Sequence, residues 1–85
     1  MTHIPALRRG LAVLSLLAKD GPMAAATIAH ELNLPRSTTY HLLAEHSAAG
    51  FVVHKPDDKK YALGEAVVPL AEAFHRHHPP AVHSG

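Results

Sequence analysis

Apolar residues recur at helical spacing near the start of the chain. Four leucines, separated by four, three and three positions, form one stripe: Leu7, Leu11, Leu14 and Leu17. This spacing places them on one side of an α-helix. Pro5 fits the first turn of that helix, where its missing N–H is not needed. Gly21-Pro22 ends the segment, because proline cannot continue a helix. The pattern predicts a first helix over about residues 5–19.

Two more helices are predicted around a tight turn. The second begins near Met23, and its apolar face consists of Ala25, Ile28, Ala29 and Leu32. Asn33 follows, a residue that tolerates the left-handed conformation of a sharp turn. Leu34-Pro35 then opens a third helix, with the proline in its first turn. We expect this helix to run to about Ala48 and to end at Gly50.

Beyond Gly50 the pattern changes from helical to extended. Residues 51–55 (FVVHK) and 60–63 (KYAL) are rich in β-branched and aromatic side chains, and residues 56–59 form a polar turn, so we predict a β-hairpin. A fourth helix follows, whose apolar face consists of Val67, Leu70, Ala71 and Phe74. The histidine- and proline-rich tail from His75 is expected to fray. The predicted fold is mainly α with a small β-hairpin, a winged helix-turn-helix of the order helix, helix, helix, strand, strand, helix.

The third helix has two unlike faces. One is spaced for burial and consists of Thr39, Leu42, Leu43 and His46. The opposite face presents Arg36, Ser37, Tyr40, His41 and Ala44. This outward face is rich in hydrogen-bond donors and has no acid before Glu45. Such a helix fits the major groove of DNA, where arginine binds guanine and serine or threonine binds a phosphate or a base edge. Residues 27–43 therefore predict a helix-turn-helix that binds double-stranded DNA.

Lysines gather at the tip of the predicted hairpin. These are Lys55, Lys59 and Lys60, which a wing would bring to neighbouring phosphates. Asp57 and Asp58 cancel part of this charge, or else shape the turn.

Single residues of the third helix have ordinary alternatives. Arg36 can be a solvated charge, and Ser37 can satisfy free amides at the helix start. Tyr40 can pack along the helix, and we leave its role open. His41 can pair with Glu45 one turn later, although we favour a DNA contact.

Composition and charge limit the classes of protein to which this chain can belong. With 85 residues and 47% hydrophobic residues, the chain has room for one small folded domain. It has no cysteine, so disulfides and thiol chemistry are excluded. Residues 11–18, the longest apolar stretch, cannot span a bilayer, and no signal peptide precedes them, so we expect a cytoplasmic protein without membrane contact. The net charge is only +1, so DNA-binding charge must be local. This low charge leaves an alternative function, a winged-helix protein-interaction module without DNA binding.

Metal binding and catalysis have little support. The tail gathers His75, His77, His78 and His83, and histidine-rich tracts bind transition metals. No fixed element would hold a coordination geometry there, so we expect no metal site and no cofactor, with a metal-responsive regulator as a further alternative. We also expect no enzyme, because no nucleophile elbow, paired carboxylates or phosphate-binding glycine loop is present.

Several short motifs occur together in order. They are residues 6–14 (ALRRGLAVL), 28–39 (IAHELNLPRSTT), 41–43 (HLL) and 61–64 (YALG). With these motifs the chain resembles the N-terminal domain of the IclR family of bacterial transcription regulators over about residues 5–70. The resemblance implies that Arg36, Ser37, Thr38 and His41 fall at DNA-contact positions and that the first helix takes part in dimerisation. We expect a homodimer on an operator, with the first helix and the fourth helix as the dimer seam.

The chain departs from this family in two ways. Family members carry a larger effector-binding domain after a linker helix, whereas this chain ends at Gly85 without one. We expect residues 1–64 to be the DNA-binding domain and residues 65–85 a linker helix with a flexible tail, in either a fragment or an effector-free relative. His46 also stands where the family has an apolar residue. An unpaired buried imidazole would cost about 1–3 kcal/mol, so we expect it at the core edge or beside an acceptor.

Overall fold

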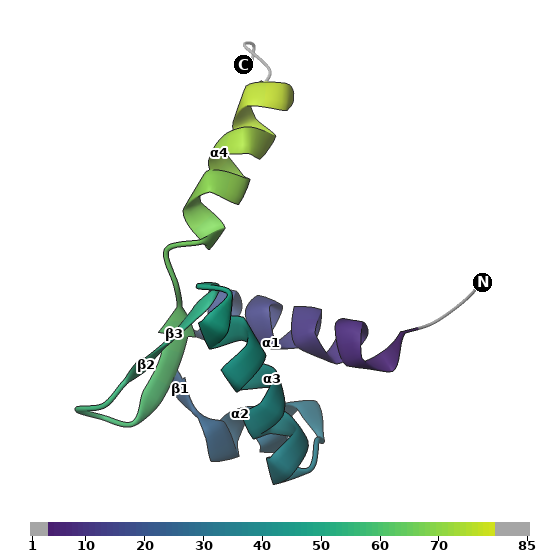
Figure 1. Cartoon of the computed structure of the whole chain (residues 1–85), viewed down its shortest axis with the longest axis vertical. Coiled ribbons are helices and arrows are strands. Elements are labelled where there is room, and N and C mark those ends of the chain that lie inside the picture. The colour runs from purple at the N-terminus through teal and green to yellow at the C-terminus, as the bar shows by residue number, and fades with distance from the viewer. Residues whose placement is uncertain (1–3, 80–85) are drawn as a thin grey trace.

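The computed structural model describes residues 4–79 of the chain. Its elements, in order, are α1 (Pro5–Asp20), β1 (Met23–Ala24), α2 (Ala25–Leu32), α3 (Arg36–Ala48), β2 (Val52–Lys55), β3 (Lys60–Leu63) and α4 (Val67–His77). The first three helices pack together beside an antiparallel sheet, and α4 projects away from this body (Figure 1). The predicted winged helix-turn-helix is confirmed.

The hydrophobic core lies where the three helices meet the sheet. Its buried members are Val13, Leu17, Met23, Ala25, Ile28, Leu43 and Val52. Each of α1, α2, α3, β1 and β2 contributes at least one of them. Full burial of one such large aliphatic side chain stabilises the fold by about 1.5–3 kcal/mol. No residue of α4 belongs to this core, because none of its side chains is buried.

The apolar stripe of α1 divides between two environments. The buried residues of this helix are Gly10, Val13 and Leu17. Leu7 and Leu11, which share the stripe with Leu17 in the sequence, are 56% and 55% exposed. The helix therefore faces the core with a side that includes a glycine, and leaves half of its leucine stripe outside.

Left-handed residues form the turns on both sides of α3. Asn33 has φ 55° and ψ 49°, and the Leu34 N–H donates to the Ala29 carbonyl at 2.9 Å. Gly50 has φ 85°, and the Phe51 N–H donates to the His46 carbonyl at 2.9 Å. Both patterns are helix C-terminal motifs that satisfy otherwise unpaired carbonyls. The predicted turn at Asn33 and helix end at Gly50 are confirmed.

The prediction that the second helix begins near Met23 was wrong by two residues. Met23 and Ala24 form β1, whose residues pair with Tyr61 and Lys60 of β3. The sheet therefore has three strands, in the order β1-β3-β2, instead of the two of a hairpin. Pairing with β3 holds this segment extended, and α2 starts at Ala25.

Two helix ends also differ from the predictions. Pro35 precedes α3 as its N-cap, in extended conformation with ψ 149°, and is not part of the first turn. The chain does not fray at His75, because α4 continues to His77. His78 completes the end of α4: its N–H donates to the Phe74 carbonyl at 2.8 Å, and its ring stacks on Phe74 with centroids 4.6 Å apart. His83, which was considered as a metal ligand, lies outside the described residues.

A close backbone contact attaches the start of α4 to the body. The Gly64 N–H donates to the Phe51 carbonyl at 2.8 Å, and the Ala66 N–H donates to the Gly50 carbonyl at 3.0 Å. A Cβ atom at Gly64 would overlap the Gly50 carbonyl oxygen. This explains the glycine at the end of the YALG motif.

Within residues 4–79, no helix is both long enough and apolar enough to cross a membrane.

Candidate nucleic-acid interface

The outward face of α3 is accessible along its length. Its exposed residues are Arg36, Ser37, Tyr40, His41 and Ala44. On the opposite side Thr39 and Leu43 are 0% and 1% exposed. The Thr39 hydroxyl donates to the Pro35 carbonyl at 3.0 Å, so this buried polar group is satisfied. The division of the helix into a buried and an accessible face is as the sequence predicts. Thr38 lies at the boundary and is half-buried.

Two of the ordinary alternatives for this face are not realised within residues 4–79. No side chain caps the N-terminus of α3, so Ser37 does not satisfy its free amides. His41 and Glu45 form neither a hydrogen bond nor an ion pair in this part of the chain. The polar atoms of Ser37 and His41 are therefore accessible to a ligand.

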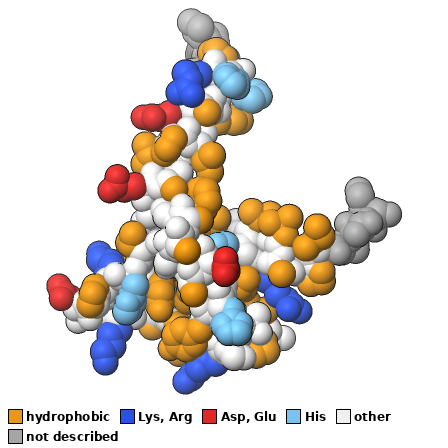
Figure 2. Space-filling model, in the orientation of Figure 1, with side chains coloured by type: hydrophobic (Ala, Val, Ile, Leu, Met, Phe, Trp, Pro, Cys, Tyr) orange, Lys and Arg blue, Asp and Glu red, His pale blue; other side chains and the backbone are white. Residues whose placement is uncertain are grey.

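The lysines of the hairpin are all exposed. Lys55 ends β2, Lys60 begins β3 and Lys59 lies in the turn between them. In Figure 2 basic side chains follow the lower edge of the body, below the long arm of α4. The Lys60 N–H donates to the Asp58 carboxylate at 3.2 Å, so this acid shapes the turn. Lys59 has φ 57°, a conformation that costs an L-residue other than glycine, asparagine or aspartate about 1–2 kcal/mol.

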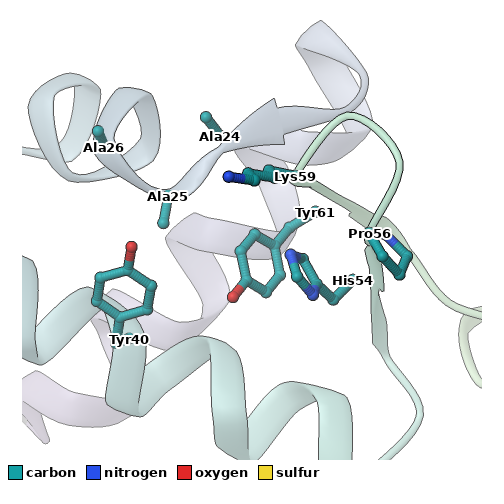
Figure 3. A pocket seen from close by; sticks show the side chains of 8 residues that line it. All are labelled: Ala24, Ala25, Ala26, Tyr40, His54, Pro56, Lys59 and Tyr61. Carbon is teal, nitrogen blue, oxygen red and sulfur yellow. The ribbon is translucent and has the colours of Figure 1, made fainter.

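A pocket of about 540 Å³ lies between α3, the hairpin and the start of α2 (Figure 3). Its lining residues are Ala24, Ala25, Ala26, Tyr40, His54, Pro56, Lys59 and Tyr61. His54 and Tyr61 are paired across β2 and β3, and their rings stack with centroids 4.6 Å apart. Sequence reasoning did not identify His54 and Tyr61 as site residues. In the sequence, only the predicted β-hairpin connects these two residues, because it pairs their strands.

The polar side chain of His46 lies at the edge of the core, as the sequence led us to expect. It is half-buried, and its Nε2 atom lies 2.8 Å from the Gly10 carbonyl oxygen. The expected acceptor is therefore present, and it comes from α1.

The histidines of the tail were considered as metal ligands, and of these His75, His77 and His78 lie within the described residues. Residues 4–79 contain no group of three or more histidine, cysteine or acidic side chains placed to hold a metal ion.

The family model of the IclR helix-turn-helix domain matches residues 6–56, which include α1 from its second residue, the helix-turn-helix and β2. The chain belongs to the IclR helix-turn-helix family.

Similar proteins agree with the IclR assignment. The chain is 50% identical over 44 residues to the uncharacterized HTH-type transcriptional regulator RhmR of Escherichia coli (strain K12), covering 52% of this chain and 17% of that protein. It superposes on an IclR transcriptional regulator from Alicyclobacillus acidocaldarius with a TM-score of 0.80 and 28% identity, over 85% of this chain and 30% of the other. For the Agobacterium tumefaciens repressor BlcR the TM-score is 0.78 and the identity 29%, over 87% of this chain and 30% of the other.

The chain is therefore a DNA-binding domain of the kind found in transcription regulators. The comparisons do not favour a winged-helix protein-interaction module. The chain spans less than one third of the length of each of these relatives.

Proposed function

We propose that this IclR domain binds a specific DNA operator as a homodimer, with α3 in the major groove of each half-site. The observation that carries this proposal is the accessible face of α3, which is rich in hydrogen-bond donors and has no acid before Glu45. An α-helix fits the width of the major groove, and its donors can reach the acceptors on guanine and the phosphates beside it.

Individual contacts follow from position along α3. Arg36 and Ser37 lie in the first turn, the part of a recognition helix that enters the groove most deeply. Tyr40 and His41 follow one turn later on the same face, and half-buried Thr38 contacts DNA from the edge. Arg36 binds a guanine edge in this proposal, and the hydroxyl groups and His41 bind bases or phosphates.

The hairpin acts as the wing. Lys55, Lys59 and Lys60 extend from its tip, and within residues 4–79 none of them forms an ion pair with an acid. Their charges therefore remain for phosphates, which position the domain without reading sequence.

Two apolar faces supply the dimer seam. Leu7 and Leu11 of α1 are 56% and 55% exposed, and Leu70 and Phe74 of α4 are 60% and 57% exposed. Figure 2 shows hydrophobic side chains along both of these helices. A monomer would leave these large side chains in water, and a second copy of the chain can cover them.

The part of the chain from about residue 65 serves as a connecting segment in this proposal, and residues 1–64 as the DNA-binding domain. Hydrogen bonds hold the backbone to the body as far as Ala66, and no residue of α4 is buried. In this proposal the domain binds DNA in the cytoplasm and needs no catalysis, cofactor or membrane contact.

Selection of bound sequences from a random duplex pool tests this function. We expect an inverted repeat whose half-sites are centred about 34–36 Å apart or a multiple of that distance, since two α3 helices enter successive major grooves. A salt titration on the selected site should show affinity falling with a slope of about −0.9 per phosphate neutralised. No detectable duplex binding at low salt would instead favour the protein-interaction module.

A further inference from the structure

We propose that the pocket between α3 and the wing holds one sugar–phosphate unit of the bound DNA strand. The proposal rests on the DNA binding proposed above and adds a particular site to it. The pocket is lined by Tyr40 of α3, His54 and Tyr61 of the sheet, Pro56 and Lys59 of the turn, and the alanines at positions 24–26.

The position of the pocket selects the DNA backbone as its occupant. One wall belongs to α3, which is proposed to enter the major groove, and the other belongs to the wing, which is proposed to lie over the adjoining phosphates (Figure 3). A sugar–phosphate strand separates each major groove from the minor groove beside it. A strand that runs from one element to the other has to cross the opening between them.

The chemistry of the lining matches both halves of a sugar–phosphate unit. Pro56, the alanines and the aromatic rings present apolar surface suited to deoxyribose. Lys59 supplies a positive charge, and no acidic residue lines the pocket, which suits a phosphate. The hydroxyl groups of Tyr40 and Tyr61 have no hydrogen-bond partner among residues 4–79, so each can donate to a phosphate oxygen.

The placement of Lys59 is a second observation in favour of the phosphate. Its backbone has φ 57°, a conformation in which glycine or asparagine is usual. A lysine is nevertheless held there, and Figure 3 shows its side chain extending across the pocket toward Ala25. Backbone conformations of this kind occur at ligand-binding sites, where the side chain is needed in one place.

A methylphosphonate scan of the selected operator tests this site. Each duplex carries one neutral linkage, and binding of the full chain is compared with that of the variants Lys59→Gln, Tyr40→Phe and Tyr61→Phe. For the parent, neutralising the phosphate in the pocket should lower affinity about tenfold or more, the effect of a lost charge-assisted hydrogen bond. For Lys59→Gln, the same linkage should change affinity by less than about threefold, while the other linkages keep their effects.

The two tyrosine variants should lose sensitivity at the same linkage as Lys59→Gln. Lys55→Gln is the matched control, since it removes a wing charge that does not line the pocket; its altered linkage should be a different one. The proposal is overturned if the parent binds the operator but no single linkage couples to Lys59, or if Lys55→Gln couples to the same one. Failure of the parent to bind any duplex would instead overturn DNA binding itself, so the two failures are distinct.

Discussion

The His46 ring on α3 donates a hydrogen bond from Nε2 to the Gly10 carbonyl on α1, across 2.8 Å. Because a carbonyl oxygen only accepts, Nε2 carries the hydrogen. A Cβ atom at Gly10 would lie 3.1 Å from Cε1 and 3.3 Å from Nε2 of this ring, which is closer than ordinary van der Waals contact. The glycine and the histidine therefore fit each other, and together they fix α3 against α1.

We predict that His46→Ala lowers the free energy of unfolding by about 1–2 kcal/mol. The change removes one hydrogen bond, worth about 0.5–1.5 kcal/mol, and the packing of a half-buried ring. Chemical denaturation with a helical circular dichroism signal measures it. Ser47→Ala, an exposed neighbour on the same helix, is the control and should stay within about 0.5 kcal/mol of the parent.

The effect of Gly10→Ala should change sign with the residue at position 46. In the parent the new methyl group crowds the imidazole, so we expect lower stability. In the His46→Ala background the crowding is absent, and the better helix propensity of alanine should raise stability by about 0.5–1 kcal/mol. A double-mutant cycle measures this coupling. Equal effects in both backgrounds would show that the two residues do not constrain each other.

Gly64→Ala should destabilise the domain by about 1–3 kcal/mol. The added Cβ overlaps the Gly50 carbonyl oxygen, and a backbone atom cannot move aside without disturbing the hydrogen bonds around it. Thermal unfolding checks the prediction, with exposed Glu65→Ala as the control. An unchanged melting temperature for Gly64→Ala would mean that the contact between residues 50 and 64 is loose in solution.

Lys59→Asn should separate stability from DNA affinity. Asparagine tolerates positive φ, so the free energy of unfolding should stay the same or rise by up to about 1 kcal/mol. DNA affinity should fall, and the slope of its logarithm against the logarithm of salt concentration should shrink by about one. If affinity and slope both match the parent, Lys59 makes no phosphate contact.

Leu11→Glu should dissociate the proposed dimer and leave the fold intact. The side chain is 55% exposed, so a charge is solvated in the monomer but is buried without a partner at a dimer seam. Sedimentation equilibrium gives the mass, and circular dichroism the folding. Arg9→Gln changes the net charge equally from a position two residues away, on the other side of α1, and should leave the mass unchanged.

The helix ends and the two faces of α3 could be predicted from the sequence, because they depend only on residues close together in the chain. Asn33 and Gly50 mark the ends of helices because few residues tolerate a left-handed backbone. The two faces of α3 follow from helical spacing alone. These features require no knowledge of what the segment packs against.

Features that depend on distant contacts were not predictable in this way. The two residues of β1 are too few to show alternation, and they are extended because they pair with Tyr61 and Lys60. Periodicity placed Leu7 and Leu11 on one stripe with Leu17, but it could not show that α1 buries the side with Gly10, which His46 of α3 contacts. The pocket exists only once the hairpin and α3 are placed together, so His54 could not be assigned from spacing.

Arg36→Ala, measured on the selected operator and on its single-base variants, tests most directly whether the face of α3 reads DNA. We expect this variant to bind the operator about 1–3 kcal/mol more weakly and to lose discrimination at one base pair of each half-site, while preferences elsewhere persist. Parent-level affinity together with unchanged preference at every base pair would contradict the assignment of α3 as the recognition helix.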